Sequence, residues 1–273
     1  MKQATPPSPT AREREGEGSP PAAGQFNRPE LQRVYLLLGE EVTAALEKTR
    51  VIVVGLGGVG SWAAEALARS GIGHITLIDN DSVCPSNINR QIQALPSTVG
   101  LPKAAALMKR LLEINPRCDI AAFNQIFSLE TAPLFGIEKA DYVIDAIDSL
   151  PHKLDLIQYA ERPTLFSSMG MAQKLDPTRI KTADIWNTRG CSLARLVRQG
   201  LRKRCFAGHF TTVFSDEQLP RHEAVSYESG ESGKKIINGS IVTVTAAAGM
   251  TLASLVINDV CHTMTDHFSG EGF

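Results

Sequence analysis

The sequence has few cysteines, and none is arranged to bind a metal. Its five cysteines are odd in number and scattered, and no two form a C-x-x-C pair. This distribution argues against a disulfide framework and against a zinc site made of cysteine pairs. We therefore expect a protein of the reducing cytoplasm.

The chain also lacks an excess of charge of either sign. Lys and Arg total 28 and Asp and Glu total 29, so the formal net charge is -1. This balance gives no overall attraction to nucleic acid or membrane, so such a contact would need a local patch. The run RLVRQGLRKR is a candidate RNA-binding patch, and a solvated helix face is an equally weighted alternative. Its cationic residues are Arg195, Arg198, Arg202, Lys203 and Arg204.

Long apolar segments are almost absent too. Residues 1–26 combine Pro, Gly, Ser and mixed charge without the apolar core of a signal peptide, so we expect a disordered tail there and a second short tail at 266–273. The charge-free run 241–257 approaches the length that crosses a membrane. Its Thr, Ser, Gly and Ala content favours a helix buried in the core or in a subunit interface, with membrane contact as the less favoured alternative.

What the sequence does contain is an alternation of strand and helix patterns up to about residue 170. Apolar runs such as RVIVVG and DYVID alternate with helical segments such as SWAAEALAR and KAAALMKRLLEI. This predicts an α/β, Rossmann-like, mostly parallel sheet with helices on both faces and ligands beyond the carboxyl ends of the strands. Afterwards we expect an antiparallel extension, a basic helix, a polar loop over 214–235 and a C-terminal apolar helix.

The expected division of the chain follows from this change of pattern. Residues 27–170 would form a nucleotide-binding core, and residues 171–265 would form the substrate-binding and dimer-forming part of the same domain. With 43% hydrophobic residues, the chain can bury a core of that size.

A glycine turn follows the first apolar strand. Gly55, Gly57 and Gly60 match G-x-G-x-x-G between a strand and a helix, and Asp79 ends the next strand, where it is placed for a ribose hydroxyl. On its own this fingerprint also fits a nicotinamide-dependent dehydrogenase. A turn that needs glycine only for tight helix packing is the structural alternative.

Two cations near this turn favour a triphosphate. Arg90 lies in a polar loop after the Asp79 strand, and Lys103 starts the following helix. Arginine binds phosphate oxygens in a fork and lysine acts as a compact charge, so together they would offset charge that builds up during transfer. The alternative is that both are ordinary surface charges.

Two carboxylates follow the strand YVI. Asp145 and Asp148 lie at a strand end beside the expected phosphates, where carboxylates commonly hold magnesium. Asp145 could instead cap the next segment or pair with a nearby base. We favour Asp148 as the metal or nucleotide ligand.

Taken together, the motifs resemble those of the ubiquitin-activating-like adenylating superfamily. The resemblance spans about residues 30–262 and rests on VGLGGVGSWAAEALARSGIGHITLIDNDSV, NINRQ, VGLPKAAAL, INP and DAIDS, in this order and spacing. Within the superfamily the chain looks most similar to the tRNA threonylcarbamoyladenosine dehydratases. The segments GSWAAEALARSGIG and LDPTRI, the pair Gly239-Ser240 before the last helix, and the missing zinc-binding cysteine pairs carry this closer assignment.

The resemblance implies a protein that binds ATP with magnesium and adenylates a carboxylate. It places Gly58 at the phosphates, Asp79 at the ribose, Lys103 at the triphosphate and Asp148 at the magnesium, with Arg90, Lys103 and Asp148 as the catalytic residues. The further nucleotide contacts that it implies are Ser86, Asn87, Asn89, Arg90, Gln91 and Ser149. It also implies a homodimer in which an arginine of the partner's N-terminal helix reaches the nucleotide; Arg33 has that position, and Arg28 is a substitute.

The function implied is the ATP-dependent cyclising dehydration of N6-threonylcarbamoyladenosine beside the tRNA anticodon. It would run through an acyl-adenylate and release pyrophosphate and AMP. Adenylation of the C-terminal glycine of a ubiquitin-like sulfur carrier is the alternative, and a nucleotide-sensing or sulfur-relay module is a non-enzymatic one. A monovalent cation and a cysteine desulfurase or sulfur-acceptor partner stay open, and neither Cys191 nor Cys205 aligns with a functional cysteine.

Overall fold

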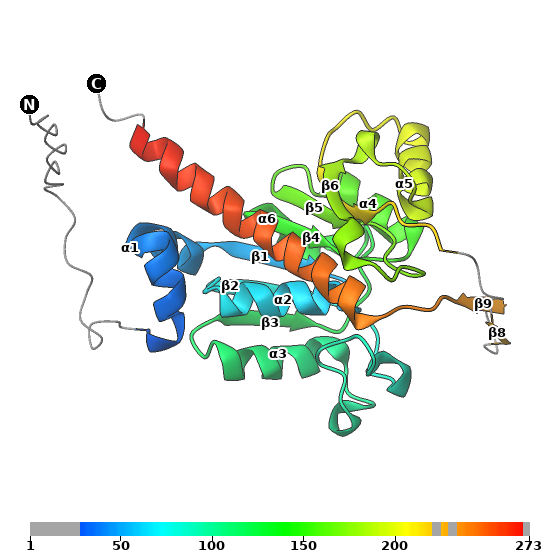
Figure 1. Ribbon diagram of the computed structural model, residues 1–273, viewed down its shortest axis with the longest axis horizontal. Coiled ribbons are helices and arrows are strands. Elements are labelled where there is room, and N and C mark those ends of the chain that lie inside the picture. The colour runs from blue at the N-terminus through cyan, green and yellow to red at the C-terminus, as the bar shows by residue number, and fades with distance from the viewer. Residues whose placement is uncertain (1–27, 220–224, 229–233, 270–273) are drawn as a thin grey trace, which may run out of the picture.

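The computed structural model describes residues 28–219, 225–228 and 234–269 (Figure 1). The expected tail at 1–26 lies outside the described residues, as do residues 270–273 of the second tail. The helices are α1 (Gln32–Lys48), α2 (Gly60–Arg69), α3 (Lys103–Ile114), α4 (Leu150–Tyr159), α5 (Ser192–Lys203) and α6 (Val242–Ser269). The strands are β1 (Arg50–Val54), β2 (His74–Ile78), β3 (Asp119–Phe123), β4 (Tyr142–Asp145), β5 (Thr164–Ser168), β6 (Ile180–Asp184), β7 (Thr211–Ser215), β8 (Val225–Glu228) and β9 (Lys234–Ile237).

The central sheet has the strand order β3-β2-β1-β4-β5-β7-β6, and every pair in it is parallel except β6 with β7. This confirms the predicted parallel sheet and its antiparallel extension. The register places Val54 level with Ile78 in β2 and with Asp145 in β4. Because parallel strands end on the same side, the glycine turn, the Asp79 loop and the turn after β4 all start from one carboxyl edge.

Helices cover both faces of the sheet, and the alternating side chains of the strands explain why. In β1, Val51 and Val53 belong to the core that the sheet shares with α2, α3 and α6. Ile52 and Val54 point the other way, into the core shared with α4 and α5. A strand that is apolar on both sides must be covered on both faces of the sheet. The near-continuous apolar runs in the sequence predict this arrangement.

The charge-free segment forms the first part of α6, which runs along α2 (Figure 1). Val242–Met264 has the length and hydropathy of a membrane span, with a mean hydropathy of 1.5. However, one side of it is buried in the core through Val244, Ala248, Leu252, Ala253, Val256 and Val260. The packing is close enough to need Gly249, where an added Cβ would lie 2.5 Å from the carbonyl oxygen of Val59. This burial supports the interpretation as a core helix.

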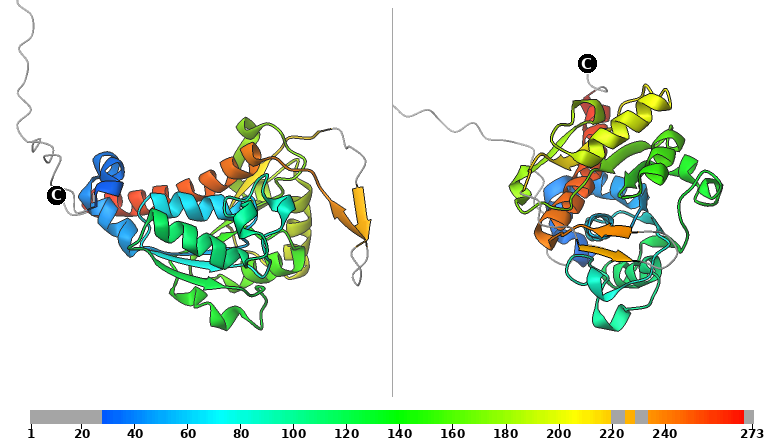
Figure 2. Two further views of the ribbon diagram at one scale, coloured as in Figure 1. Left: turned by 90° about the horizontal axis from the view of Figure 1, so that it is seen from below. Right: turned by 90° about the vertical axis from the view of Figure 1, so that its right-hand side faces the viewer.

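Two details differ from the expectations, and a third, in α1, was not foreseen. The expected polar loop over 214–235 contains β8 and the start of β9, which pair with each other as a hairpin apart from the main sheet (Figure 2). The last helix continues to Ser269, into the expected second tail. The N-terminal helix α1 is kinked at Gly39, whose φ of 81° is non-helical. A left-handed conformation of this kind is open to glycine at no steric cost.

The contact between α6 and α2 gives a first prediction. Gly249→Ala should lower the free energy of unfolding by about 2 kcal/mol, since overpacking against a backbone oxygen outweighs the better helix propensity of alanine. Urea unfolding followed by circular dichroism measures it. Gly239→Ala is the matched control, because an added Cβ there meets nothing within 4 Å. Equal unfolding midpoints for both variants and the unchanged protein would contradict the close packing.

Candidate functional site

The glycine turn connects β1 to α2 at the carboxyl edge of the sheet. Gly55 has a φ of +88°, and a Cβ on it would lie 2.7 Å from the carbonyl oxygen of Ala146, in the turn after β4. A Cβ on Gly60 would lie 1.9 Å from the carbonyl oxygen of Gly55. Both positions therefore require glycine for packing alone. Gly57 does not, because a Cβ there would meet nothing within 4 Å. A side chain at Gly57 would extend into open space over the turn, where a bound phosphate would need close access to the backbone.

Asp79 follows β2 and bonds to the glycine turn. Its Oδ2 accepts a hydrogen bond from the backbone N–H of Leu56 at 2.6 Å, and its Oδ1 accepts one from the N–H of Asp81 at 2.8 Å. Burial raises the pKa of Asp79 above its ordinary value, although the nearby Lys103 ammonium and the two backbone bonds oppose the shift. The structure thus places this carboxylate directly beside the turn.

Lys103 is buried, with 7% of its side chain exposed, and is not an ordinary surface charge. Its ammonium bonds to Oδ2 of Asp81 at 2.6 Å and lies 4.0 Å from Oδ1 of Asp79. Asp81 was not expected from the sequence, where it is one acidic residue in a polar loop. Only the folded loop shows that it holds the lysine. These two carboxylates keep the charge of Lys103 in position.

Arg90 lies beside the glycine turn at Gly58. Its Cγ would lie 3.2 Å from a Cβ on Gly58, and the same Cβ would lie 3.1 Å from Thr245 of α6. The guanidinium donates to the carbonyl oxygen of Ser86 and to Oδ1 of Asn89, both at 2.9 Å. The structure therefore brings two cations to the glycine turn: Arg90, from the loop after β2, lies beside Gly58, and Lys103, the first residue of α3, approaches through Asp79.

Hydrogen bonds of side-chain amides fix the loop that carries Arg90. Oδ1 of the buried Asn87 accepts from the N–H of Cys84 at 3.0 Å, and Nδ2 of Asn89 donates to the carbonyl oxygen of Ser240 at 2.9 Å. Gln91 is 5% exposed, and its Oε1 has no hydrogen-bond partner among the described residues. Gln93, which the sequence did not single out, donates to the carbonyl oxygen of Leu56 at 2.8 Å. In the sequence, the only feature that could have indicated Gln93 is that it lies two residues after Gln91.

The two carboxylates after β4 have different environments. Asp145 is fully buried and binds Lys153, so the alternative of pairing with a base is correct for it. Asp148 is exposed, and Ser149 is the N-cap of α4 without a side-chain capping bond. In the described part of the chain, no three His, Cys, Asp or Glu side chains gather into a metal site. One free carboxylate fits magnesium that completes its shell with water and phosphate oxygens.

The two candidate arginines of the N-terminal helix region do not reach this site within one chain. Arg33 is exposed on α1, which lies at the opposite end of the sheet from the glycine turn (Figure 1). Arg28 is held by its own chain, since its guanidinium bonds to Glu30, to Glu47 at 2.8 Å and to Asn115 at 2.6 Å. Of the two, Arg33 is the one that is exposed.

The basic run forms α5, which starts close to the carboxyl edge. Gly170, just after β5, would place a Cβ 3.7 Å from Sγ of Cys191, the N-cap of α5. Arg198 bonds to Thr188, and Arg204 bonds to Asp155 at 2.6 Å. Within this run, the exposed cations that form no ion pair with another described residue are Arg195, Arg202 and Lys203. Arg202 also lies 5.4 Å from the ring centre of Trp186.

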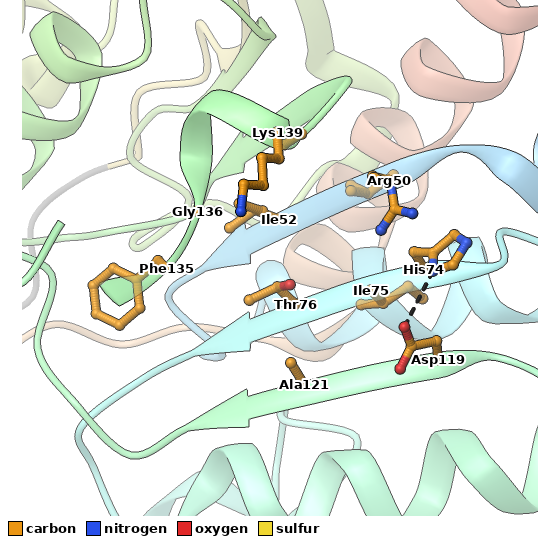
Figure 3. A pocket seen from close by; sticks show the side chains of 12 residues that line it. Arg50, Ile52, His74, Ile75, Thr76, Asp119, Ala121, Phe135, Gly136 and Lys139 are labelled. Carbon is orange, nitrogen blue, oxygen red and sulfur yellow. Dashed lines mark hydrogen bonds and ion pairs between the residues drawn. The ribbon is translucent and has the colours of Figure 1, made fainter. Parts of the chain in front are cut away.

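A hollow of about 180 Å³ lies at the other edge of the sheet and gathers none of the predicted residues. Figure 3 shows the side chains of Arg50 and Lys139 directed into it, with His74 bonded to Asp119 below. Arg50, His74 and Asp119 are the first residues of β1, β2 and β3, so this hollow lies at the start of the strands and not at their carboxyl ends. The candidate site is therefore the open carboxyl edge, not this hollow.

The parallel sheet and its glycine turn place the protein in the class of α/β proteins with a nucleotide-binding turn. The model of the ThiF family matches residues 31–271, and the chain belongs to the ThiF family. A relative from Bacillus subtilis (strain 168), named tRNA threonylcarbamoyladenosine dehydratase, is 40% identical over 244 residues, 86% of this chain and 94% of that protein.

Two further comparisons show how much of the chain is similar to proteins of each kind. The crystal structure of E. coli tRNA N6-threonylcarbamoyladenosine dehydratase in complex with ATP has a TM-score of 0.78 at 32% identity. It covers 92% of this chain and 100% of that chain. A molybdopterin-synthase adenylyltransferase of Escherichia coli (strain K12) is 38% identical over 127 residues, 46% of this chain and 49% of that protein.

The raised pKa of Asp79 gives a prediction about stability. Below the unfolded-state pKa, near 3.9, the carboxyl is protonated in both states and contributes nothing. Above it, the unfolded chain releases its proton before the folded protein does, so the carboxyl costs stability as the pH rises. Asp79→Asn should therefore gain stability relative to the unchanged protein as the pH rises from about 4 up to the raised pKa of the folded protein. Urea unfolding at several pH values measures this; parallel stability curves would contradict the burial of the charge.

Proposed function

We propose that this protein is an ATP-dependent tRNA threonylcarbamoyladenosine dehydratase. In this reaction the threonine carboxylate of the modified adenosine is joined to AMP and then displaced from within the same modification. The observation that supports the proposal most is the convergence of Arg90 and Lys103 on one glycine turn that leaves open space at Gly57. The overall likeness to a dehydratase of known structure extends over most of the chain.

The first step needs charge compensation more than a protein nucleophile. A carboxylate oxygen attacks the α-phosphorus of ATP, the bond to the β-phosphate oxygen breaks, and pyrophosphate leaves. Arg90 and Lys103 supply fixed positive charge for the oxygens that gain negative charge. Magnesium bound by Asp148 and by the phosphates would neutralise the leaving pyrophosphate. The backbone of the glycine turn, at the N-terminus of α2, would approach the phosphates.

The second step joins two groups that are already neighbours. An atom of the carbamoyl group attacks the activated carbonyl, AMP leaves with the former carboxylate oxygen, and a ring closes with the net loss of one water. Since both reacting groups belong to one nucleotide, the protein contributes mainly by holding them in place. Proximity of this kind can supply roughly 7–11 kcal/mol in the best cases.

The tRNA would lie along α5. This helix starts near the carboxyl edge and rises about 18 Å over its length, with Arg195, Arg202 and Lys203 exposed. An anticodon base at the glycine turn would therefore have cationic surface beside it for the neighbouring phosphates.

Adenylation of a ubiquitin-like sulfur carrier is the second candidate. Its support is the likeness to an adenylyltransferase, but that likeness covers less than half of this chain. We further propose a cytoplasmic homodimer in which Arg33 of one subunit approaches the nucleotide of the other. A monovalent cation and a sulfur-transfer partner are additional proposals that only the family resemblance supports. The division of the chain near residue 170 is a further proposal, which rests on the change of pattern in the sequence.

The reaction itself has a direct test. The protein is incubated with ATP, magnesium and tRNA that carries N6-threonylcarbamoyladenosine, and the digested nucleosides are weighed by mass spectrometry. We expect the modified nucleoside to lose one water, with one AMP formed per nucleoside. ATP turnover that requires a small carrier protein and leaves the nucleoside unchanged would favour the sulfur-carrier alternative.

The proposed tRNA surface gives a separate prediction. Lys203→Glu on α5 should weaken tRNA binding and reduce the salt dependence of log K by about one unit, because one phosphate contact is lost. Fluorescence anisotropy over a salt series measures this, and ATP binding should not change. Lys109→Glu on α3, also exposed, makes the same charge change away from α5. Equal losses in both variants would contradict a surface on α5.

A further inference from the structure

A buried ion pair lies directly under the carboxyl edge and takes no part in the chemistry proposed above. The side chains of Asp145 and Lys153 are both 0% exposed, and Nζ of Lys153 donates to Oδ2 of Asp145 at 2.7 Å. The same oxygen accepts from the hydroxyl of Ser167 at 2.7 Å, and Ser167 is also fully buried. With no exposed surface, Lys153 cannot touch a bound nucleotide.

Fold stability alone does not account for such a pair. Taking two charges out of water is costly, and apolar residues of similar volume often stabilise a fold equally well or better. A buried ion pair therefore points to a role other than stability, such as fixing a particular backbone geometry. The bonds around Asp145 show which geometry this is.

The pair closes the turn that connects β4 to α4. Oδ1 of Asp145 accepts from the N–H of Ile147 at 3.1 Å, so one carboxylate holds both the start of the turn and the side chain of Lys153 in α4. The N–H of Ala146 donates to the carbonyl oxygen of Val54 at 2.8 Å. The carbonyl of Ala146 is the group that a side chain at Gly55 would strike.

We infer that Asp145 and Lys153 are positioning residues for Asp148. The ion pair fixes the turn from Ala146 to Ser149 on three elements, β4, β5 and α4, and so holds the exposed carboxylate of Asp148 beside the glycine turn. This inference rests on the proposed function, in which Asp148 holds magnesium at the triphosphate. Ser167 supports the pair as the second donor to the same oxygen.

The test uses the full chain with the double substitution Lys153→Met and Asp145→Asn, which removes both charges and leaves no buried charge unpaired. ATP binding is measured calorimetrically in EDTA and in magnesium. We expect an EDTA affinity close to that of the unchanged protein and a magnesium-ATP affinity about tenfold weaker, the scale on which lost support of a metal ligand acts. Without any ligand, the Ile147 amide should exchange its hydrogen about tenfold faster.

Two further variants keep the result decisive. Ser167→Ala removes one donor and leaves the ion pair, so both changes should appear with a smaller size, about threefold. If the double variant does not fold, unchanged values in Ser167→Ala overturn the inference. Glu65→Gln is the matched control, because it removes a different buried carboxylate, which pairs with Arg69 and Arg110. It should lower the melting temperature and leave both ATP affinities unchanged.

The remaining outcomes separate the two proposals. A folded double variant with unchanged magnesium-ATP affinity and unchanged exchange at Ile147 shows that the pair is merely structural and overturns the inference. If the unchanged protein binds no ATP at all, the proposed function fails, and the inference fails with it. In that case, faster exchange at Ile147 would show only that the ion pair fixes the turn, and it would say nothing about magnesium binding.

Discussion

The close approach of two backbone turns is the constraint on which the candidate site depends. Gly55 and the carbonyl of Ala146 meet at a distance that excludes any side chain at residue 55. This contact joins the turn after β1 to the turn after β4, which leads to Asp148. The buried bonds of Asp145 fix that junction from below, and α6 supports the glycine turn through Thr245.

The charged side chains around the junction differ in how deeply they are buried. Lys103 is enclosed between Asp79 and Asp81, and its positive charge is thereby held at the edge of the sheet instead of extending into solvent. Arg90 and Asp148 stay more accessible. A nucleoside triphosphate is strongly anionic, and fixed cations act on it without having to reorganise. Preorganised charge of this kind is what carboxylate activation requires.

Much of the fold could be predicted from the sequence because its signals are local. The apolar strands, the glycine spacing and the position of Asp79 each follow from a few neighbouring residues. The partners of the charged residues could not be predicted, because Asp81 meets Lys103 only when the loop after β2 lies against the start of α3, and Asp145 meets Lys153 only when α4 packs against β4. The hairpin of β8 and β9 was missed as well, because polar Gly- and Ser-rich segments have the composition of loops.

The most direct test of the account is the position of the phosphates in a crystal of this protein grown with ATP and magnesium. We predict triphosphate oxygens within about 3 Å of both the Arg90 guanidinium and the Lys103 ammonium, above the glycine turn. A nucleotide bound with either of these side chains directed into bulk solvent, away from every phosphate group, would contradict it.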